Sequence, residues 1–428
     1  MSSRIQIKQR YRRADGHGVI PRSAGLPNLD ENRLGVFWRP LIDLSDSPTT
    51  ALRLRMIGPV NAWLTDPASE RWSWFSRIGL AGLRHQVIRH AGLDAYDCTE
   101  PAGLAPELRT TGWGGLVQAV EHFRELDTRR RALVLFQLAQ LSFQRVAIRL
   151  AGDLAPAGTG VGDGNGNAAA AAEHTRYLYE IARVHAASPG GTTRALELFE
   201  NIADAAADPL IALAACFQGI GHSLRSVDRR NSALRFAARG RAIPKSAVAD
   251  GWHARLVRSH FHRATALLAL DDGDIDAARR ELDTALGLHA ELASQELDAS
   301  DGMVVQENRR YLLEVELTLA RQQGDSAARD ALPGLCALLL SIDPYCVQAR
   351  LSAGDAFAAL GDIAIAADHY RQAGELGTGA GALGWFRAAQ CFEALGECGQ
   401  ALHAMGRVLE LDPSAIEARE YLASGLRP

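Results

Sequence analysis

The segment WHARLVRSHFH, residues 252–262, concentrates three histidines, a residue type that serves both as a zinc ligand and as a general base. On a helix, His253 and His260 are seven residues apart and share one face, whereas His262 points elsewhere. No cysteine or carboxylate is spaced so as to complete a ligand set around them. The pattern therefore predicts histidines that pack within a helical protein, and it predicts no metal site.

The glycine-rich stretch GTGVGDGNG, residues 158–166, is the other segment whose composition suggests a chemical site. A phosphate-binding loop needs a lysine followed by serine or threonine, and a strand before it, and this stretch has neither. The chain also contains no GxSxG elbow and no HExxH motif. We therefore predict a protein that is not an enzyme and that needs no cofactor.

Composition narrows the class of protein further. The 428 residues are 47% hydrophobic and 22% charged, which is enough apolar material for a packed core. The net charge of -4 gives no general attraction to nucleic acid or to an anionic membrane. Six scattered cysteines without a CxxC pair, and no apolar run of the roughly 20 residues that cross a bilayer, predict a cytoplasmic protein. Composition does not fix the oligomeric state.

Four regions of the chain differ in composition and in the spacing of their apolar residues. Residues 1–111 are rich in Trp and Arg and have poor helical periodicity, so we expect an irregular region. Residues 112–151 have apolar residues at three- and four-residue steps and predict a long helix or a helix pair. Residues 152–174, rich in Gly, Ala and Asn, predict a flexible loop. From 175 to 428 helical patterns alternate with Gly, Pro and Asp breaks.

The stretches 359–377 and 394–413 are two copies of one pattern, offset by 35 residues. The matching pairs are Gly354 with Ala389, Phe357 with Phe392, Gly361 with Gly396, Ala366 with Ala401, Tyr370 with Met405, and Ala373 with Val408. Two antiparallel helices need small residues in order to approach closely, and a large residue of the next turn fills the remaining groove. One such pair leaves an apolar face uncovered, so a further pair must stack on it.

This spacing resembles the tetratricopeptide repeat family. The residues that match its motif best are Trp385, Ala388, Ala389, Phe392, Gly396, Ala401, Met405, Val408 and Pro413. A weaker copy upstream uses Phe217, Ile220, Gly221, Leu224, Ala233, Ala237 and Gly240. The resemblance spans about 175–428 and is specific in 345–428. It implies a mainly all-α fold, an α-helical hairpin repeat solenoid with an irregular N-terminal region.

In such an array the first helices of successive hairpins line a concave groove, and their outward residues are free of packing. These candidate binding residues are Gln218, His222, Arg225, His260, Arg263, Asp355, Phe386, Gln390 and Glu393. Arginine pairs with carboxylates through two parallel hydrogen bonds. We therefore expect a protein or peptide partner, with an acidic segment or a C-terminal carboxylate as the candidate ligand.

The basic stretch KQRYRR, residues 8–13, contains one aromatic residue, Tyr11. Its chemistry suits phosphates or an acidic partner, but a solvated terminus is the simpler interpretation. The whole pattern predicts a non-enzymatic adaptor or scaffold that holds a peptide or protein partner in its groove. Two alternatives stay open, a peptide-sensing regulator and an accessory subunit of a biosynthetic enzyme.

Overall fold

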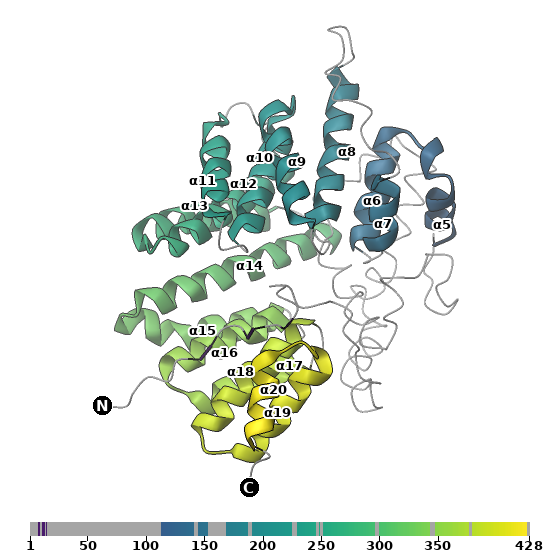
Figure 1. Ribbon diagram of the computed structural model, residues 1–428. Helices are drawn as coiled ribbons and strands as arrows, with labels where there is room; N and C mark the ends of the chain where they lie inside the picture. Colours follow the sequence, from purple (N-terminus) through teal and green to yellow (C-terminus); the bar gives the residue numbers. More distant parts are fainter. Residues whose placement is uncertain are drawn as a thin grey trace. The chain divides into compact units, whose positions relative to one another are not determined.

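The computed structural model describes residues 7, 8, 11, 12, 14, 113–140, 144–152, 168–186, 191–224, 229–244, 248, 251–295, 299–342, 347–375 and 379–425. The regular elements in these residues are helices (Figure 1), which confirms the mainly all-α fold class. Two compact units divide the chain, and their boundary falls between Asn308 and Arg309. The second unit also contains the described residues between 7 and 14. The remaining predictions for 1–111 lie outside the described residues.

The first unit opens with short helices. These are α5 (Trp113–Glu121), the 3-10 helix η4 (Phe123–Glu125), α6 (Thr128–Gln140) and α7 (Gln144–Gly152). We had predicted one long helix or a helix pair here, and three α-helices are present instead. The first break arises because the carboxylate of Asp127 accepts the backbone N–H of Arg130 at 2.8 Å and starts a new helix at α6.

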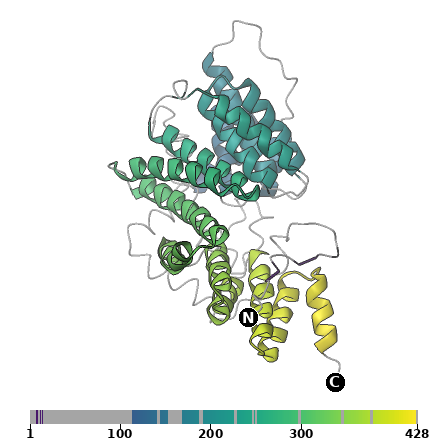
Figure 2. The same ribbon diagram turned by 90° about the vertical axis from the view of Figure 1, so that its left-hand side faces the viewer.

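Helical hairpins make up the rest of the first unit (Figures 1 and 2). They pair α8 (Ala168–Ala186) with α9 (Thr192–Ala205), α10 (Pro209–Leu224) with α11 (Arg230–Ala242), and α12 (Trp252–Asp271) with α13 (Ile275–Ala293). Helix α10 packs against both α8 and α12, so the first helices of the hairpins form one layer. This is the repeat arrangement that the sequence pattern predicted.

The predicted flexible loop 152–174 is wrong at both of its ends. Helix α7 continues through Gly152, and helix α8 already begins at Ala168. Five consecutive alanines, 168–172, open this helix, and alanine has the highest intrinsic helix propensity of all residues. The sequence argument counted alanine as a residue that buries little, when its backbone preference was the stronger signal.

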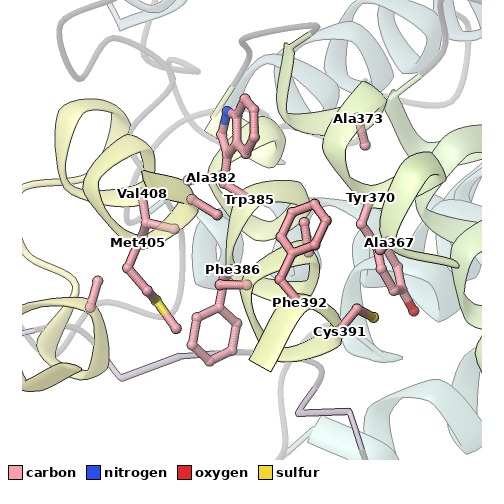
Figure 3. Close-up of a cluster of buried hydrophobic side chains, with 14 of the residues drawn as sticks. Ala367, Tyr370, Ala373, Ala382, Trp385, Phe386, Cys391, Phe392, Met405 and Val408 are labelled. Atoms are coloured by element: carbon pink, nitrogen blue, oxygen red, sulfur yellow. The ribbon is translucent and has the colours of Figure 1, made fainter. Parts of the chain in front are cut away.

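The second unit contains the C-terminal part of α14 (Ala299–Gln323), followed by α15 (Ser326–Ile342). Two hairpins follow, α16 (Val347–Leu360) with α17 (Ile363–Glu375) and α18 (Gly379–Ala394) with α19 (Cys398–Leu411), and then helix α20 (Ile416–Gly425). The hairpins share a buried cluster that includes Tyr370, Trp385 and Met405 (Figure 3). Both copies of the 35-residue pattern are therefore folded as hairpins, which confirms the predicted register.

Each of these hairpins turns on a glycine in the left-handed conformation. Gly361 has φ 95° and Gly396 has φ 77°, values that residues with a Cβ rarely adopt. In the second turn the N–H of Glu397 returns to the carbonyl of Phe392 at 2.8 Å, as in a Schellman motif. The LGD and LGE sequences thus end one helix and start the next.

Aromatic rings pack directly onto helical glycines where helices cross. A Cβ placed on Gly354 would lie 2.5 Å from the ring of Tyr370, and a Cβ on Gly219 would lie 2.5 Å from the ring of Phe236. The sequence alignment used Gly221 as the small residue of α10, but no atom lies within 4 Å of a Cβ built there. The close approach in this hairpin therefore uses Gly219, two residues earlier.

Gly384 tests this packing, because a Cβ there would lie 2.6 Å from the backbone nitrogen of Gly374 and 2.7 Å from the carbonyl oxygen of Tyr370. Backbone atoms cannot swing aside, so we expect Gly384→Ala to destabilise the C-terminal hairpins by about 3 kcal/mol. Gly406→Ala is the control, since no atom lies within 4 Å of its Cβ position in α19. It should stabilise by about 0.4–1 kcal/mol. Urea unfolding followed by circular dichroism measures both, and equal midpoints would contradict the close crossing.

Candidate functional site

The described residues of the segment 7–14, which are Ile7, Lys8, Tyr11, Arg12 and Ala14, lie against the C-terminal repeats. The contacts come from two regions that are about 400 positions apart in sequence, with Lys8 meeting Gln390 and Arg12 meeting Glu417. We call the residues that receive them, Phe386, Gln390, Asp412, Glu417 and Glu420, the segment-binding surface. They belong to α18, to the turn after α19, and to α20.

Two sets of backbone hydrogen bonds hold the segment. The Gln390 side chain accepts the N–H of Lys8 at 2.7 Å and donates to its carbonyl oxygen at 3.2 Å. Further along, the N–H of Ala14 donates to the carbonyl of Ser414 at 2.8 Å, and Ile416 donates to the carbonyl of Arg12 at 2.9 Å. The last two bonds form an antiparallel bridge, so this part of the segment is held as a short strand would be. None of these bonds depends on the side chains of the segment.

The Tyr11 side chain is the anchor of the segment. Its ring is 8% exposed and meets the Phe386 ring edge-on, with centroids 5.3 Å apart. Its hydroxyl donates to a carboxylate oxygen of Asp412 at 2.9 Å. Asp412 is 1% exposed and also accepts hydrogen bonds from the Ser414 hydroxyl and N–H. The apolar ring and its hydroxyl thus both find partners inside the repeats.

Arg12 lies beside two carboxylates of α20. Its guanidinium lies 3.0 Å from Glu417 and 3.2 Å from Glu420, while its backbone N–H donates to Glu417 at 2.7 Å. Burial raises the pKa of the Glu417 carboxyl, but the hydrogen bonds from Arg12 outweigh that effect and leave the pKa below its ordinary value. The side chain of Arg12 is 66% exposed, so this ion pair contributes more to selectivity than to stability.

Asp355, predicted as a binding residue, instead joins several helices. Its carboxylate accepts the Tyr370 hydroxyl at 2.6 Å and lies 3.0 Å from the Arg387 guanidinium and 3.4 Å from that of Arg321. Burial, together with this carboxylate, raises the pKa of Tyr370. The Asp355 side chain is 12% exposed, so the prediction of a solvent-facing binding group is wrong here. The reason is that α14, α17 and α18 all present polar groups to one point on α16.

The other three predicted binding residues of the second unit, Phe386, Gln390 and Glu393, differ in their exposure and contacts. Phe386 is 2% exposed and contacts the Tyr11 ring, and Gln390 binds the backbone of the segment. Glu393, one turn further along α18, is exposed. The structure therefore brings Phe386 and Gln390 together on one face and leaves Glu393 outside the contact.

The predicted residues of the first unit lie on α10 and α12. His222 stacks on the Phe199 ring, with centroids 6.1 Å apart, and His260 meets Phe217 edge-on at 5.2 Å. Gln218 hydrogen-bonds to the buried Tyr179. Arg263 lies one turn beyond His260 on α12, whereas Arg225 lies outside the described residues. The predicted pairing of the two arginines around a carboxylate stays a prediction.

Two buried titratable side chains near α10 and α12, His260 and Glu180, have shifted pKa values that burial explains. Burial and the nearby Arg263 lower the pKa of His260 to about 3, so the imidazole is neutral at pH 7. Glu180 on α8 is fully buried, which raises the pKa of its carboxyl to about 7 although Arg183 lies 2.9 Å away. Both side chains are packed among aromatic and aliphatic residues. For His260 this agrees with the prediction of histidines that pack within a helical protein.

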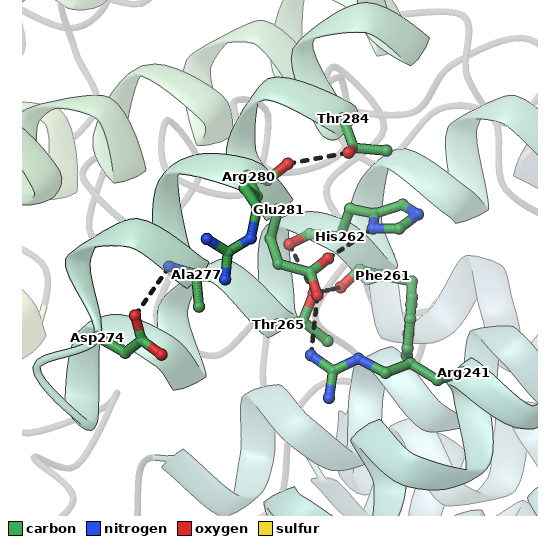
Figure 4. Close-up of polar contacts among 9 residues, drawn as sticks. All are labelled: Arg241, Phe261, His262, Thr265, Asp274, Ala277, Arg280, Glu281 and Thr284. Carbon is green, nitrogen blue, oxygen red and sulfur yellow. Dashed lines mark hydrogen bonds and ion pairs between the residues drawn. The ribbon is translucent and has the colours of Figure 1, made fainter.

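An open hollow of about 370 Å³ lies elsewhere in the first unit, between α11, α12 and α13. Glu281 lies in its wall and accepts hydrogen bonds from His262 at 2.7 Å and Arg241 at 2.8 Å (Figure 4). Burial alone would raise the pKa of Glu281, but hydrogen bonds from His262, Arg241 and Thr265 lower it to about 2. This carboxylate therefore ties three helices together.

The described residues contain no group of three His, Cys, Asp or Glu side chains placed to hold a metal ion. Across the same part of the chain, no helix combines the length and the apolarity that crossing a bilayer requires.

Comparisons with known proteins find similarity in structure but not in sequence. No family model matches the chain, and no curated protein matches it in sequence. Among solved structures, the human IFIT1 dimer with m7Gppp-AAAA has a TM-score of 0.40 and 13% identity, over 82% of this chain and 72% of that chain. Yeast Tom70 has a TM-score of 0.34 and 12% identity, over 91% and 82%. In the APC/C hetero-tetramer Cut9–Hcn1 the values are 0.29 and 16%, over 90% and 78%. Similarity at this level carries no information about the partner of this chain.

Sequence reasoning missed three of the five residues of the segment-binding surface. Phe386 and Gln390 were predicted from the repeat register, but Asp412, Glu417 and Glu420 were not. Residues 8–13 were interpreted as a solvated terminus, whereas the described ones pack on the repeats. The available signal was Tyr11, since one tyrosine among basic residues supplies an anchor that a solvated tail does not need.

The lowered pKa of Glu281 predicts a pH-dependent contribution to stability. The stabilisation should be present above the ordinary carboxyl pKa of about 4.5 and should be lost as the pH falls toward 2. We expect Glu281→Gln to cost about 1.5–3 kcal/mol at pH 7, as for hydrogen bonds to a charged group, and less at each step below pH 4.5. Urea unfolding between pH 7 and pH 3 measures this difference. Asp283→Asn, at an exposed position of the same helix, is the control, and a pH-independent cost of Glu281→Gln would contradict the linkage.

Proposed function

We propose that this protein is a non-enzymatic adaptor or scaffold that binds an extended peptide segment of a partner protein on the segment-binding surface. The observation that carries the proposal is that the backbone groups of Lys8, Arg12 and Ala14 already form hydrogen bonds there. A surface that satisfies the backbone of one extended segment has the geometry to satisfy another.

Different residues of the surface contact the backbone and the side chains of the segment, which supports a binding role. Gln390 uses both its donor and its acceptor on a peptide unit, which any sequence offers. The turn before α20 adds two more backbone bonds, in the manner of strand addition. Phe386 then supplies an apolar contact for one large side chain. Backbone bonds of this kind give affinity, and the aromatic contact gives selectivity.

The first unit offers a second face for binding. Arg263, His260 and Gln218 lie on first helices of neighbouring hairpins, the positions at which the sequence predicted a site for an acidic segment or a C-terminal carboxylate. The lowered pKa of His260 leaves Arg263 as the cation of this set at pH 7. We keep the acidic ligand as a proposal for this face alone, because the segment-binding surface of the second unit is itself acidic.

A display library of random peptides, selected on the immobilised full chain, tests the proposed function. The affinities are measured in the full chain carrying Tyr11→Ala and Arg12→Ala, because the segment of the wild-type chain uses the same Gln390 bonds and would compete. In that chain Gln390→Ala removes two hydrogen bonds to the peptide backbone, so it should weaken selected peptides of every sequence by about tenfold, from roughly 0.5–1.5 kcal/mol per bond. Gln400→Ala, at an exposed position on α19 of the same hairpin, is the matched control and should leave their affinities unchanged. Fluorescence anisotropy of the labelled peptides gives the dissociation constants, and selected peptides that bind equally with and without Gln390→Ala would contradict the proposal.

A further inference from the structure

The contacts of residues 7–14 separate into those that any peptide makes and those that depend on sequence. The sequence-dependent contacts are the burial of Ile7 and Tyr11, the hydroxyl bond to Asp412, and the ion pairs of Arg12. Ile7 and Tyr11 are each 8% exposed and belong to the same buried cluster as the residues of α18 and α19. The surface therefore distinguishes an apolar residue, a tyrosine four positions later, and an arginine directly after it.

We propose that the partner segment is a basic, tyrosine-containing extended peptide, and that residues 7–14 are a resident occupant which this peptide displaces. The inference rests on the proposed function and names the ligand chemistry. The side-chain acceptors of the surface are the carboxylates of Asp412, Glu417 and Glu420. An acidic peptide would meet like charges there, so a cationic one is selected.

Tyr11 and Arg12 play different parts in this recognition. The tyrosine is buried against Phe386 and Asp412, where water is excluded, and such central aromatic anchors dominate the energy of an interface. The ion pairs of Arg12 are exposed to solvent, and exposed ion pairs affect selectivity and association rate more than affinity. Removal of the tyrosine from a ligand should therefore cost much more affinity than removal of the arginine.

Displacement is physically accessible because the resident segment buries little. Of its described residues, only Ile7 and Tyr11 enter the cluster, while Lys8 and Arg12 remain exposed. The segment competes with a free peptide for the surface. Because segment and surface belong to one chain, the effective concentration of the segment at the surface is high. A free peptide therefore binds the wild-type chain only in the fraction of time that the segment is released.

A fluorescein-labelled peptide of residues 4–16, RIQIKQRYRRADG, is the probe for this inference. It is titrated against the full wild-type chain and against the full chain carrying Tyr11→Ala and Arg12→Ala, whose own segment is weakened while the surface is intact. We expect at least about tenfold tighter binding to the double variant, because the resident competitor is lost. A probe with Tyr11→Ala should bind it at least about tenfold more weakly, and a probe with Arg12→Ala only a few-fold more weakly.

Variants of the surface complete the test. Asp412→Asn with Glu417→Gln, added to the double variant, should reduce probe binding by about tenfold, whereas Leu338→Ala on α15, an exposed side chain outside the surface, should not change it. Hydrogen exchange of residues 7–14 should accelerate in the wild type when an isotopically heavy copy of the probe is added in excess. Circular dichroism confirms that each variant remains folded.

Each failure has a distinct meaning. If library peptides of another chemistry bind the surface and the probe does not, the proposed function stands and this inference is overturned. Binding of the probe that ignores Asp412 and Glu417, or hydrogen exchange that does not respond to it, overturns the inference as well. A wild-type chain that dimerises until Tyr11 is removed assigns the surface to a second copy and also overturns it. The absence of binding by any extended peptide removes both proposals.

Discussion

The close crossing of neighbouring helices is the constraint on which the rest of this structure depends. Where α16 meets α17, the Tyr370 ring occupies the space that a side chain at position 354 would need, and the Trp385 ring takes the same place at Gly374. Helices that approach this closely bury their contact faces completely, which commits one side of every helix to packing. Only the opposite side of the first helices is then available for polar chemistry, and this division decides where a ligand can bind.

The second unit uses that free side in two ways. Asp355 on α16 gathers Tyr370, Arg387 and Arg321, so charge on the inner layer serves to fix successive helices against one another. On the first helix of the next hairpin, α18, Gln390 meets the backbone of residue 8 instead. A carboxylate that already has three donors around it has little capacity left for a ligand, whereas a half-buried side-chain amide offers both a donor and an acceptor. The change from fixing to binding occurs between α16 and α18.

Much of this architecture could be predicted from the sequence because its causes are local. The 35-residue offset between Gly361 and Gly396 follows from turns that need a left-handed residue, and Phe386 and Gln390, which the same register selected, both contact the segment. The contact between Tyr11 and Asp412 could not be predicted in this way, since no periodicity links two residues 401 positions apart. The polar network at Asp355 could not be predicted for a related reason, because the residues that contact its carboxylate come from three other helices. Local pattern therefore predicts which side of a helix is free, and tertiary contacts determine what occupies it.

The same contact that blocks the binding surface also completes the core beside it. Phe386 is 2% exposed and Asp412 is 1% exposed with Tyr11 packed against them, so departure of the segment removes an edge-on ring contact and one of the hydrogen bonds to a buried carboxylate. A ligand that restores both contacts replaces what the segment supplied, whereas one that restores neither leaves the last hairpin weakened. The proposed selectivity for a tyrosine-containing ligand and the stability of α18–α20 thus rest on the same packing arrangement. Binding free energy at this surface is in part the folding free energy of the repeats that form it.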